Sequence, residues 1–456
     1  MSIPFVLLLI IGVILTSLTL IFMMVSVREK EPRAARLALM LAMTEAIAFS
    51  SFLFLFSIQA QQIVLWSLAG LAIISVIVYS LPIGRWKETP QIPEKKIDER
   101  TIMFARMRLQ TGTPEYEAYY KMHPKHKAGD ERIRARGWGG KSGLHVKVME
   151  MAAEASFTAV CSLRDAVDGE VAAQKIEISA EERTDFILNL ARHFGARNAG
   201  VTRLEPYHIY SHVGRGAGKW GEEINLPHTY AIAITTEMEY ENVMAAPRQP
   251  IMAESARQYA NIGLAAVQLA DAIRRMGYEA RAHIDGNYQV VCPLVARDAG
   301  LGEIGRMGLL MAPDIGPRVR IAVVTTTMEL KPYVYEPDTS VIDFCLICKK
   351  CAESCPSQSI SHDDRTMVNG ALRWQINQQT CYEYWTMAGT DCGRCMAVCP
   401  YSHDDHWMHG LIRKGIQHSG VFRRIALSAD DVLYGRIPKP KPAPEWIRRI
   451  DKHEEK

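Results

Sequence analysis

The stretch "CLICKKCAESCP", residues 345–356, decides the organisation of this chain. It places four cysteines at Cys345, Cys348, Cys351 and Cys355, and a proline follows the last of them. Three closely spaced thiolates can wrap around one cubane iron–sulfur cluster, whereas the fourth, beside the proline turn, points away from it. The stretch therefore predicts one cluster with three local ligands and a second cluster that receives the fourth cysteine.

A partner set of cysteines lies downstream in "CGRCMAVCP", residues 392–400. Cys381 stands eleven positions before Cys392, so the residues between them are expected to loop out while Cys381 reaches the same cluster. The C-x2-C-x2-C-x3-C-P spacing is that of bacterial two-cluster ferredoxins, in which the last cysteine ligates the other cluster. The first predicted [4Fe-4S] cluster takes Cys345, Cys348, Cys351 and Cys399, and the second takes Cys355, Cys381, Cys392 and Cys395.

Composition limits the other possibilities. The chain has 456 residues, enough for two or three domains, and its net charge of +3 does not point to bulk nucleic-acid binding. Eight of the ten cysteines lie within residues 345–399, which is a metal-binding pattern rather than a disulfide framework. Two zinc sites are the alternative, but the two Cys-Pro terminations favour cubane clusters. Cys161 and Cys292 are predicted to be ordinary buried thiols.

The first 83 residues are far more apolar than the rest. Runs at residues 4–25, 37–58 and 63–81 each approach or exceed the roughly 20 residues that span a bilayer. The first run is too long for a signal peptide and no basic region precedes it, and no twin-arginine export signal is visible. The three runs predict a transmembrane anchor, with the polar segment "QAQQ" (59–62) as the loop between the last two.

Basic residues set the expected orientation of this anchor. Four lie between the first two runs and four follow the third: Arg28, Lys30, Arg33, Arg36, Arg85, Lys87, Lys95 and Lys96. By the positive-inside rule, both segments face the cytoplasm. We therefore expect a multi-pass protein of the cytoplasmic membrane, with its N-terminus outside and its large domain in the cytoplasm. Glu45, inside the second run, is a candidate for proton or quinone handling, with a hydrogen-bonded structural acid as the simpler interpretation.

The soluble part alternates helices and strands. Residues 82–96 are rich in proline and charge and are interpreted as a linker. Periodicity predicts helices at 182–196 and 254–277 and strands at 229–238 and 319–330, which indicates an α/β layer structure. The expected domains are an anchor (1–83), a linker and N-terminal extension (84–144), an α/β catalytic domain (145–335), a dicluster domain with a helical extension (336–440), and a tail (441–456). Two G-x-G-x-x-G patterns, starting at Gly216 and Gly300, lack the strand–turn–helix context of a dinucleotide site.

Three segments carry a resemblance to a known family. Residues 98–124 ("DERTIMFARMRLQTGTPEYEAYYKMHP"), 299–330 ("AGLGEIGRMGLLMAPDIGPRVRIAVVTTTMEL") and 399–416 ("CPYSHDDHWMHGLIRKGI") resemble segments of the cobamide-dependent reductive dehalogenases. More distantly, the chain is similar to the epoxyqueuosine reductases. The resemblance runs from about residue 98 to 438. It implies an α/β (α+β) cobamide-binding, nitroreductase-like core and a ferredoxin-like module with two [4Fe-4S] clusters, preceded here by three transmembrane helices.

The resemblance also implies site residues. In the family, a base-off cobamide lies between the core and the cluster module, and a tyrosine at the start of the long helix donates a proton. Here that tyrosine is Tyr259, supported by Arg320 with Arg318 as its neighbour, because a guanidinium stabilises the phenolate left behind. The implied cobamide contacts are Gly300, Gly302, Glu303, Gly305, Arg306, Asp285 and Asn287.

Two departures from the family matter. Where many members have a "GND" turn, this chain reads "HIDGN" (283–287), so that Asp285 or Asn287 lines the pocket. A carboxylate there resembles the epoxyqueuosine reductases and leaves a non-halogenated substrate open. Respiratory members are held by a separate three-span anchor protein, whereas here the spans are fused to the chain. The loop "EKE" (29–31) loosely resembles an E-x-E loop of those anchors.

The sequence thus predicts an oxidoreductase: a membrane-anchored, cobamide- and iron–sulfur-dependent reductive dehalogenase acting on a small organohalide. Its expected partners are the lipid bilayer and an electron donor that is quinol-linked or of the ferredoxin or flavodoxin type. Nucleic acid is not expected to be a partner. An epoxyqueuosine-type reductase of a non-halogenated substrate is one alternative, although a tRNA enzyme has little reason to carry three spans. A non-catalytic electron-transfer subunit is another, and the long α/β region argues against it. The substrate, the lower cobamide ligand, the electron donor and the oligomeric state are not specified.

Overall fold

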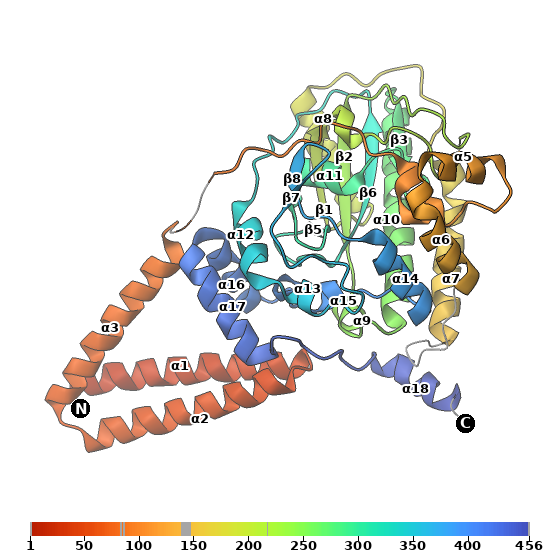
Figure 1. Cartoon of the computed structure of the whole chain (residues 1–456). Helices are drawn as coiled ribbons and strands as arrows, with labels where there is room; N and C mark the ends of the chain where they lie inside the picture. Colours follow the sequence, from red (N-terminus) through yellow and green to blue (C-terminus); the bar gives the residue numbers. More distant parts are fainter. Residues whose placement is uncertain (1, 83, 85–86, 138–146, 217, 455–456) are drawn as a thin grey trace. The chain divides into compact units, whose positions relative to one another are not determined.

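The computed structural model describes residues 2–82, 84, 87–137, 147–216 and 218–454, and its contacts divide the chain into two compact units. The first unit comprises Met1–Trp86 and Asp404–Lys439, and the second comprises Lys87–His403 and Pro440–Lys456. Figure 1 shows the elements of each unit. Arg85, one of the basic residues used to predict the orientation, lies outside the described residues.

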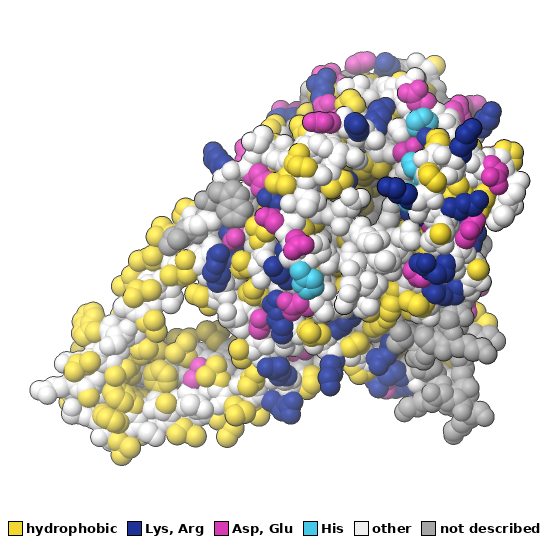
Figure 2. All heavy atoms as spheres, in the orientation of Figure 1, with side chains coloured by type: hydrophobic (Ala, Val, Ile, Leu, Met, Phe, Trp, Pro, Cys, Tyr) yellow, Lys and Arg dark blue, Asp and Glu magenta, His cyan; other side chains and the backbone are white. Residues whose placement is uncertain are grey.

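Three long helices form the apolar part of the first unit: α1 (Ile3–Arg28), α2 (Pro32–Leu55) and α3 (Ile58–Ser80). All three are long and apolar enough to cross a membrane, as predicted. Helices α1 and α2 pack along each other, and Gly12 allows their close approach because a Cβ atom there would lie 2.7 Å from the Phe49 ring. In Figure 2, these helices present mainly hydrophobic side chains, in contrast to the mixed charges over the second unit.

The turn between α2 and α3 lies earlier than predicted. Ser57 caps α3 by accepting a hydrogen bond from the Ala60 amide. The buried side chain of Gln61 donates to the carbonyls of Leu53 and Phe56 at the end of α2. The prediction of a loop at 59–62 was therefore wrong, because these polar residues form the first turn of α3 and cap the preceding helix.

Two amphipathic helices after the last cysteine also belong to the first unit: α16 (Trp407–His418) and α17 (Gly420–Tyr434). The Tyr79 hydroxyl of α3 donates to the Leu411 carbonyl of α16 at 2.9 Å, and its ring packs edge-on against Phe422 at 5.3 Å. Glu29, at the end of α1, contacts the His409 Nε2 at 2.8 Å, and both side chains are buried. The sequence interpretation assigned this segment to the dicluster domain as its extension, whereas in the structure it packs with the three apolar helices.

A four-stranded antiparallel sheet forms the core of the second unit. Its strand order is β1–β2–β6–β3, with bounds β1 (Asn198–Arg203), β2 (Tyr230–Glu237), β6 (Val319–Thr326) and β3 (Ala280–His283). The two predicted strands therefore form its centre, and Thr236 of β2 lies opposite Arg320 of β6. The mixed helix and strand content agrees with the predicted fold class.

Helices cover both faces of this sheet. One face packs against α7 (Lys147–Ser162), α8 (Ala180–His193) and α10 (Pro250–Arg275). The other packs against α11 (Cys292–Asp298) and the hairpin of β4 (Glu303–Ile304) and β5 (Leu310–Met311). Side chains alternate along a strand, so Arg320 shares the face of Ala322 and Val324, which pack in the α10 core. The fold thus places Arg320 against the helix that carries Tyr259.

The other elements of the second unit are short helices and one small hairpin. They are η1 (Glu99–Thr101), α4 (Met103–Arg106), α5 (Pro114–Met122), α6 (Pro124–Arg136), η2 (Arg164–Ala166), η3 (Pro206–His208), α9 (Tyr240–Met244), α12 (Thr339–Cys348), α13 (Lys350–Glu353), β7 (Thr366–Val368), β8 (Ala371–Arg373), α14 (Gln378–Ala388), α15 (Arg394–Ala397), η4 (Pro400–Ser402) and α18 (Glu445–Glu454). The segment between Cys381 and Cys392, expected to loop out, is mostly helical because it continues α14.

Candidate active site and cluster motifs

The predicted cluster cysteines lie on two motifs of the same local geometry. Cys348 ends α12 and Cys351 lies in α13, with Lys349 after Cys348 in the left-handed conformation (φ 57°). Gly393 (φ 58°) holds the equivalent place between Cys392 and Cys395. In each motif the left-handed residue turns the chain sharply just before a short helix, α13 in the first and α15 in the second.

Mutual electrostatic effects sort most of the thiols into two groups, although Cys395 is affected by Cys351 of the other set as well as by Cys392, Cys381 and Cys355. Burial, and then the thiols of Cys348 and Cys345, raise the pKa of Cys399. Burial, and then Cys392 and Cys355, raise the pKa of Cys381 to about 12. This grouping is that of the predicted ligand sets, and the assignment of ligands to clusters stays a prediction. Thiols with raised pKa values become thiolates at neutral pH only when a bound metal centre compensates their charge.

Tyr259 and Arg320 lie together. Tyr259 is in the third turn of α10, and the Arg320 guanidinium carbon is 5.0 Å from the centre of its ring. Arg320 Nη2 donates to Ser255 Oγ, one turn earlier on α10, at 2.6 Å, and Nη1 donates to the Val319 carbonyl at 3.2 Å. Its Nε is buried without a hydrogen-bond partner among the described residues. These contacts hold the guanidinium beside the phenol.

The phenol of Tyr259 faces the interior of the unit. Burial raises its pKa, and Arg320 opposes this rise. The residue nevertheless keeps some accessible surface. Tyr288 and Asp391 share both properties, since each is partly accessible and burial raises its pKa. Side chains that are desolvated yet not packed on every side can line a binding site.

One arginine links Tyr288 to the aromatic residue Phe104. The Arg215 guanidinium lies 5.7 Å from the centre of the Tyr288 ring and 5.8 Å from that of Phe104. Its Nε donates to Glu99 Oε1 at 3.0 Å, and Glu99 Oε2 accepts from the Arg215 and Gly214 amides. Glu99 is fully buried, so this ion pair holds Arg215 in place.

Helix α14 closes the other side of the site. Phe104 packs against Tyr382 and Trp385 with ring centres 5.6 Å and 5.9 Å apart. Burial, and then Asp391, raise the pKa of Tyr382, which shows that α14 lies near the carboxyl that precedes Cys392. Tyr288 is thus near the phenol that was predicted to donate the proton, and Arg215 and Phe104 connect it to the aromatic residues of α14. We call this set the aromatic wall: Phe104, Tyr259, Tyr288, Tyr382 and Trp385.

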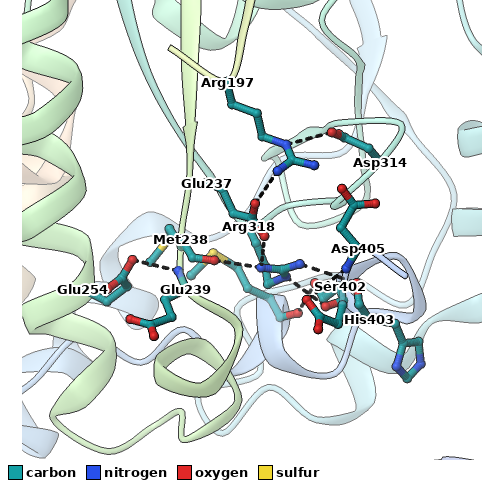
Figure 3. Close-up of polar contacts among 12 residues, drawn as sticks. Arg197, Glu237, Met238, Glu239, Glu254, Asp314, Arg318, Ser402, His403 and Asp405 are labelled. Atoms are coloured by element: carbon teal, nitrogen blue, oxygen red, sulfur yellow. Dashed lines mark hydrogen bonds and ion pairs between the residues drawn. The ribbon is translucent and has the colours of Figure 1, made fainter. Parts of the chain in front are cut away.

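Arg318, predicted as a neighbour of the catalytic pair, lies in a separate network. It is fully buried, and Figure 3 shows it between Glu237 and the last residues of the cluster module. Nη1 contacts Glu237 and the Met238 carbonyl at 2.8 and 2.7 Å, and Nε donates to the Ser402 carbonyl at 2.9 Å. This guanidinium ties β2 to the segment after the last cysteine. Because its donors are used in this way, Arg318 has no catalytic role in the function proposed below.

The end of the glycine-rich block lies against the first cluster motif. The Cβ position of Gly305 is 3.5 Å from Cys345 Sγ, which is van der Waals contact, and 2.8 Å from Met311 Cγ, so a side chain there would crowd Met311 beside the thiol. Arg306 is buried and donates from Nε to the Cys345 carbonyl at 3.0 Å and from Nη1 to the carbonyls of Ser361 and Asp363. Both residues, predicted as cobamide contacts, thus support the loop that carries the cluster thiols.

The start of the same block supports the fold. Gly302 (φ 148°) permits the β4–β5 hairpin to close, because a Cβ there would lie 2.3 Å from the Met311 carbonyl oxygen. A Cβ on Gly300 would lie 3.0 Å from the Tyr333 ring. Glu303 accepts hydrogen bonds from the Tyr335 hydroxyl and the amides of Ile304 and Asp338. The contacts of Gly300 and Glu303 thus hold residues 333–338 in place.

In the "HIDGN" turn, Asp285 lies near the candidate site, whereas Asn287 holds the turn in place. Asp285 forms an ion pair with Arg164 at 3.2 Å and is among the charges that act on Tyr259. The buried Asn287 accepts from Arg281 at 2.7 Å and donates to the Arg164 carbonyl at 3.1 Å. Asp285 therefore belongs to the candidate site, and Asn287 orients the turn.

The residues fit both implied kinds of cofactor. Two groups of four thiols are the donor set of two [4Fe-4S] clusters. Around Tyr259, an unpaired buried guanidinium nitrogen and partly accessible aromatic side chains offer the mixture of polar and apolar contacts that a large cofactor and its substrate require.

Comparison with known proteins agrees with this description. Residues 344–403 match the family model described as a 4Fe-4S dicluster domain. Over 290 residues the chain is 35% identical to the tetrachloroethene reductive dehalogenase of Sulfurospirillum multivorans, covering 56% of this chain and 57% of the relative. It is 28% identical over 130 residues to the epoxyqueuosine reductase of Listeria monocytogenes, covering 25% of this chain and 30% of that protein.

The fold comparison points the same way. The solved structure described as the catabolic reductive dehalogenase NpRdhA matches with a TM-score of 0.62 at 24% identity, covering 78% of this chain and 49% of that one. The chain thus spans about half the length of these two reductive dehalogenases. The chain is similar in sequence to reductive dehalogenases over 56% of its length, and the resemblance and the fold class predicted from the sequence are confirmed.

Several residues of the site were not predicted. Asp391 directly precedes a cluster cysteine, and that position is a signal that sequence reasoning could have used. Phe104, Arg215 and Tyr382 are brought together only by tertiary contacts, so no local pattern marks them. Of the two other cysteines, Cys292 is buried as predicted, but Cys161 is exposed on α7, which corrects the expectation of a buried thiol.

Proposed function

We propose that this protein is a membrane-anchored reductive dehalogenase. It replaces a carbon–halogen bond of a small organohalide by a carbon–hydrogen bond, which consumes two electrons and one proton and releases a halide ion. The observation that carries the proposal is the Tyr259–Arg320 pair inside an aromatic wall, in a chain similar to reductive dehalogenases over more than half its length.

The cofactors are two [4Fe-4S] clusters, held by the two cysteine sets, and a base-off cobamide beside Tyr259. When bound, the cobamide supplies a low-potential cobalt that removes the halogen. Asp391 lies beside Arg320 and directly precedes Cys392. This proximity supports the second cluster, that of Cys355, Cys381, Cys392 and Cys395, as the last carrier before the cobamide. The first cluster, if held by Cys345, Cys348, Cys351 and Cys399, would be the entry point for a quinol-linked or ferredoxin- or flavodoxin-type donor.

The proton step is assigned to Tyr259. Its phenol is the acid, and the Arg320 guanidinium, 5.0 Å from the ring, stabilises the phenolate that remains. Ser255 holds Arg320 through the 2.6 Å hydrogen bond. The aromatic wall limits the access of water, so that the proton comes from this phenol and not from solvent.

The anchor keeps the enzyme at the cytoplasmic membrane with its catalytic unit in the cytoplasm. The basic residues between α1 and α2 support this orientation. Within the first unit, the α1–α2 loop residue Glu29 contacts His409, which follows the cluster module in the chain. This contact requires both segments to be on one side of the membrane.

Halide release tests the proposal. The detergent-solubilised protein, reconstituted anaerobically with cobamide, iron and sulfide, is supplied with reduced methyl viologen and a panel of organohalides. We expect halide and the dehalogenated product in equal amounts, with activity strongly reduced in the Tyr259→Phe variant. No halide from any compound, with cobalt and iron fully bound, would contradict the proposal.

A second candidate function is reduction of a non-halogenated substrate, because Asp285 puts a carboxylate near Tyr259. In this structure the carboxylate is engaged in the ion pair with Arg164 at 3.2 Å. Nucleoside analysis of tRNA from a deletion strain separates the two functions, since accumulated epoxyqueuosine would favour the second.

A further inference from the structure

A pocket in the second unit lies apart from the Tyr259 site. Its walls come from the linker that follows α3, from α11, β4 and α12, from residues 335–337 and from the β7–β8 hairpin (Figure 1). Helix α11 and β4 pack on the face of the sheet opposite to α10, so this pocket is not part of the site around Tyr259. Among the described residues that line it, none takes part in the mechanism proposed above.

The lining combines apolar side chains with two flat rings. Tyr335 and Trp374 supply the rings, and leucine, isoleucine, proline and alanine side chains supply much of the remainder. The Arg297 guanidinium carbon lies 4.6 Å from the centre of the Tyr335 ring. Trp374 is buried, and its Nε1 donates to the Asp363 carbonyl at 3.1 Å, which fixes the ring. Such walls suit a planar ligand that is largely apolar.

Four polar atoms of the lining are buried without a hydrogen-bond partner among the described residues. They are Arg297 Nη2, Arg365 Nε, Arg373 Nε and Glu88 Oε2. Arg297 is only 6% exposed, and its other two nitrogens contact Asp298 and the Gln91 carbonyl. Because buried polar groups are normally hydrogen-bonded, these three donors and one acceptor indicate a ligand that has both acceptors and a donor.

Arg373, in β8, is the guanidinium most available to a ligand. Within the described part of the chain it has no hydrogen bond or ion pair from its side chain. Burial, and then the charge of Arg297, lower its pKa, which shows that the two guanidiniums are close. The carboxylates of the lining are engaged elsewhere, since Glu88 Oε1 contacts Arg365 at 2.5 Å and Glu303 accepts three hydrogen bonds.

The pocket borders the first cysteine motif. Ile342, which lines it, is on α12 three residues before Cys345. Ile304 also lines it, and the Cβ position of the next residue, Gly305, is 3.5 Å from Cys345 Sγ. A ligand in this pocket therefore lies next to the motif at which electrons enter in the proposed function.

We propose that this pocket binds the ring of a hydroquinone, the electron donor of the proposed reaction. A hydroquinone is planar and apolar except for two hydroxyl groups, and each hydroxyl can accept from a guanidinium N–H and donate to a carboxylate. Its oxidation to the quinone releases two electrons and two protons. The electrons go one at a time to the iron–sulfur centre predicted at Cys345, and the protons go to the Glu88 carboxylate and from there to water. This inference rests on the proposed function and deepens it, because it selects one class among the donors left open.

Quinone binding tests the site directly. The affinity of the oxidised full-length protein, loaded with iron, sulfide and cobamide, for menadione is measured by calorimetry in detergent. In Arg373→Met, which breaks no hydrogen bond among the described residues, we expect binding to weaken about tenfold or more, since hydrogen bonds from charged groups are the strong ones. Arg373→Lys should recover part of it. Arg203→Met, an exposed arginine at the end of β1, is the matched control and should bind menadione unchanged.

Electron transfer is measured in the direction from protein to quinone. The dithionite-reduced, fully loaded protein is mixed with menadione or with ferricyanide, and the recovery of the cluster absorbance is followed by stopped flow. The rate with menadione should saturate with its concentration and, at low concentration, fall about tenfold in Arg373→Met, whereas the rate with ferricyanide should not fall. An equal fall with both oxidants overturns the proposal, because Arg373 would then act on the clusters and not on a ligand.

Three further results overturn the proposal. They are an unchanged menadione affinity in Arg373→Met, Arg373-dependent binding of flavin mononucleotide in place of menadione, and loss of bound cobalt in Arg373→Met with menadione binding unchanged. Failure of the proposed function is distinct. If no organohalide is dehalogenated but menadione binds with the expected dependence on Arg373, the function fails and the site stands. If organohalides are dehalogenated with reduced methyl viologen and menadione does not bind, the site fails and the function stands.

Discussion

In the proposed function Tyr259 releases a proton, although burial raises the pKa of its phenol. A weaker acid is a poorer donor at neutral pH, so the neighbouring Arg320 is needed to stabilise the phenolate as it forms. The same rise in pKa keeps the acid form present at alkaline pH. At the scale of single residues, catalysis therefore depends on this balance between burial and one positive charge.

The balance predicts the behaviour of Tyr259→Phe. Removal of the hydroxyl should lower kcat by about 100-fold or more, the usual contribution of a general acid, while cobalt and iron content stay unchanged. In the unmodified protein, kcat should hold as pH rises and fall only above the ordinary phenol value of 10.0, because the donor is lost when pH passes its raised pKa. A pH–rate profile with an alkaline limb near neutrality, or full activity in Tyr259→Phe, would refute the assignment.

The two arginines of β6 should respond differently to substitution. Arg320→Gln should lower kcat with little effect on stability, because Arg320 acts on the phenolate. Arg318→Gln should destabilise the unit by about 3 kcal/mol, because it leaves Glu237 without one of its partners and the backbone acceptors of Arg318 unsatisfied. Thermal unfolding and kcat per bound cobalt measure the two effects. An equal loss of kcat in both variants would show that Arg318 also acts in catalysis.

At the scale of the element, the two cysteine motifs differ in the residue that makes the same left-handed turn. Lys349 carries a side chain at φ 57°, whereas Gly393 at φ 58° has none. A Cβ on Gly393 would lie 2.5 Å from Ile251 Cγ1 of α10. The second motif is thus packed against α10, and position 393 tolerates only glycine.

This difference predicts that Gly393→Ala loses one cluster. The left-handed conformation costs an alanine about 1–2 kcal/mol, and the contact with Ile251 adds to that cost. We expect about half of the iron to remain, measured per protein after reconstitution. Lys349→Gly is the matched control and should keep all of it, since glycine adopts the same φ without strain. Full iron content in Gly393→Ala would contradict the packing described.

Sequence reasoning succeeded where the signal is local. The cluster cysteines follow a short fixed spacing, and the central strands and α10 follow hydrophobic periodicity over one segment each. Tyr259 and Arg320 came from the resemblance. Arg215 and the aromatic wall were not predictable, because their positions depend on tertiary contacts among five distant segments. Arg318 was misjudged because strand alternation specifies a face but not what the side chain contacts on it.

At the scale of the whole molecule, the unit that holds the three apolar helices is built from two parts of the chain. Helices α16 and α17, which follow the cluster module, pack with α1–α3 in one unit. Gly415 of α16 lets the rings of Tyr79 and Phe422 come close, since a Cβ there would lie 2.6 Å from each. The amphipathic pattern of these helices did not reveal from sequence which surface they cover.

Deletion of residues 1–86 should therefore not give a well-behaved soluble protein. The truncated chain would expose the apolar faces of α16 and α17 that α1–α3 cover, and we expect it to aggregate or to bind detergent, as measured by size-exclusion chromatography. The control is the same truncation with residues 404–439 replaced by a Gly/Ser linker, which should be more soluble. Equal solubility of the two proteins would show that α16 and α17 remain soluble without the contacts that α1–α3 provide.

The metal content of the purified protein tests the central claim most directly. The claim is that two clusters feed one cobalt beside Tyr259, within a fold similar to reductive dehalogenases. After anaerobic reconstitution with cobamide, iron and sulfide, cobalt and iron analysis should give about one cobalt to eight irons, together with a corrinoid absorbance. About eight irons with no cobalt would contradict the account and leave an iron–sulfur protein that only transfers electrons.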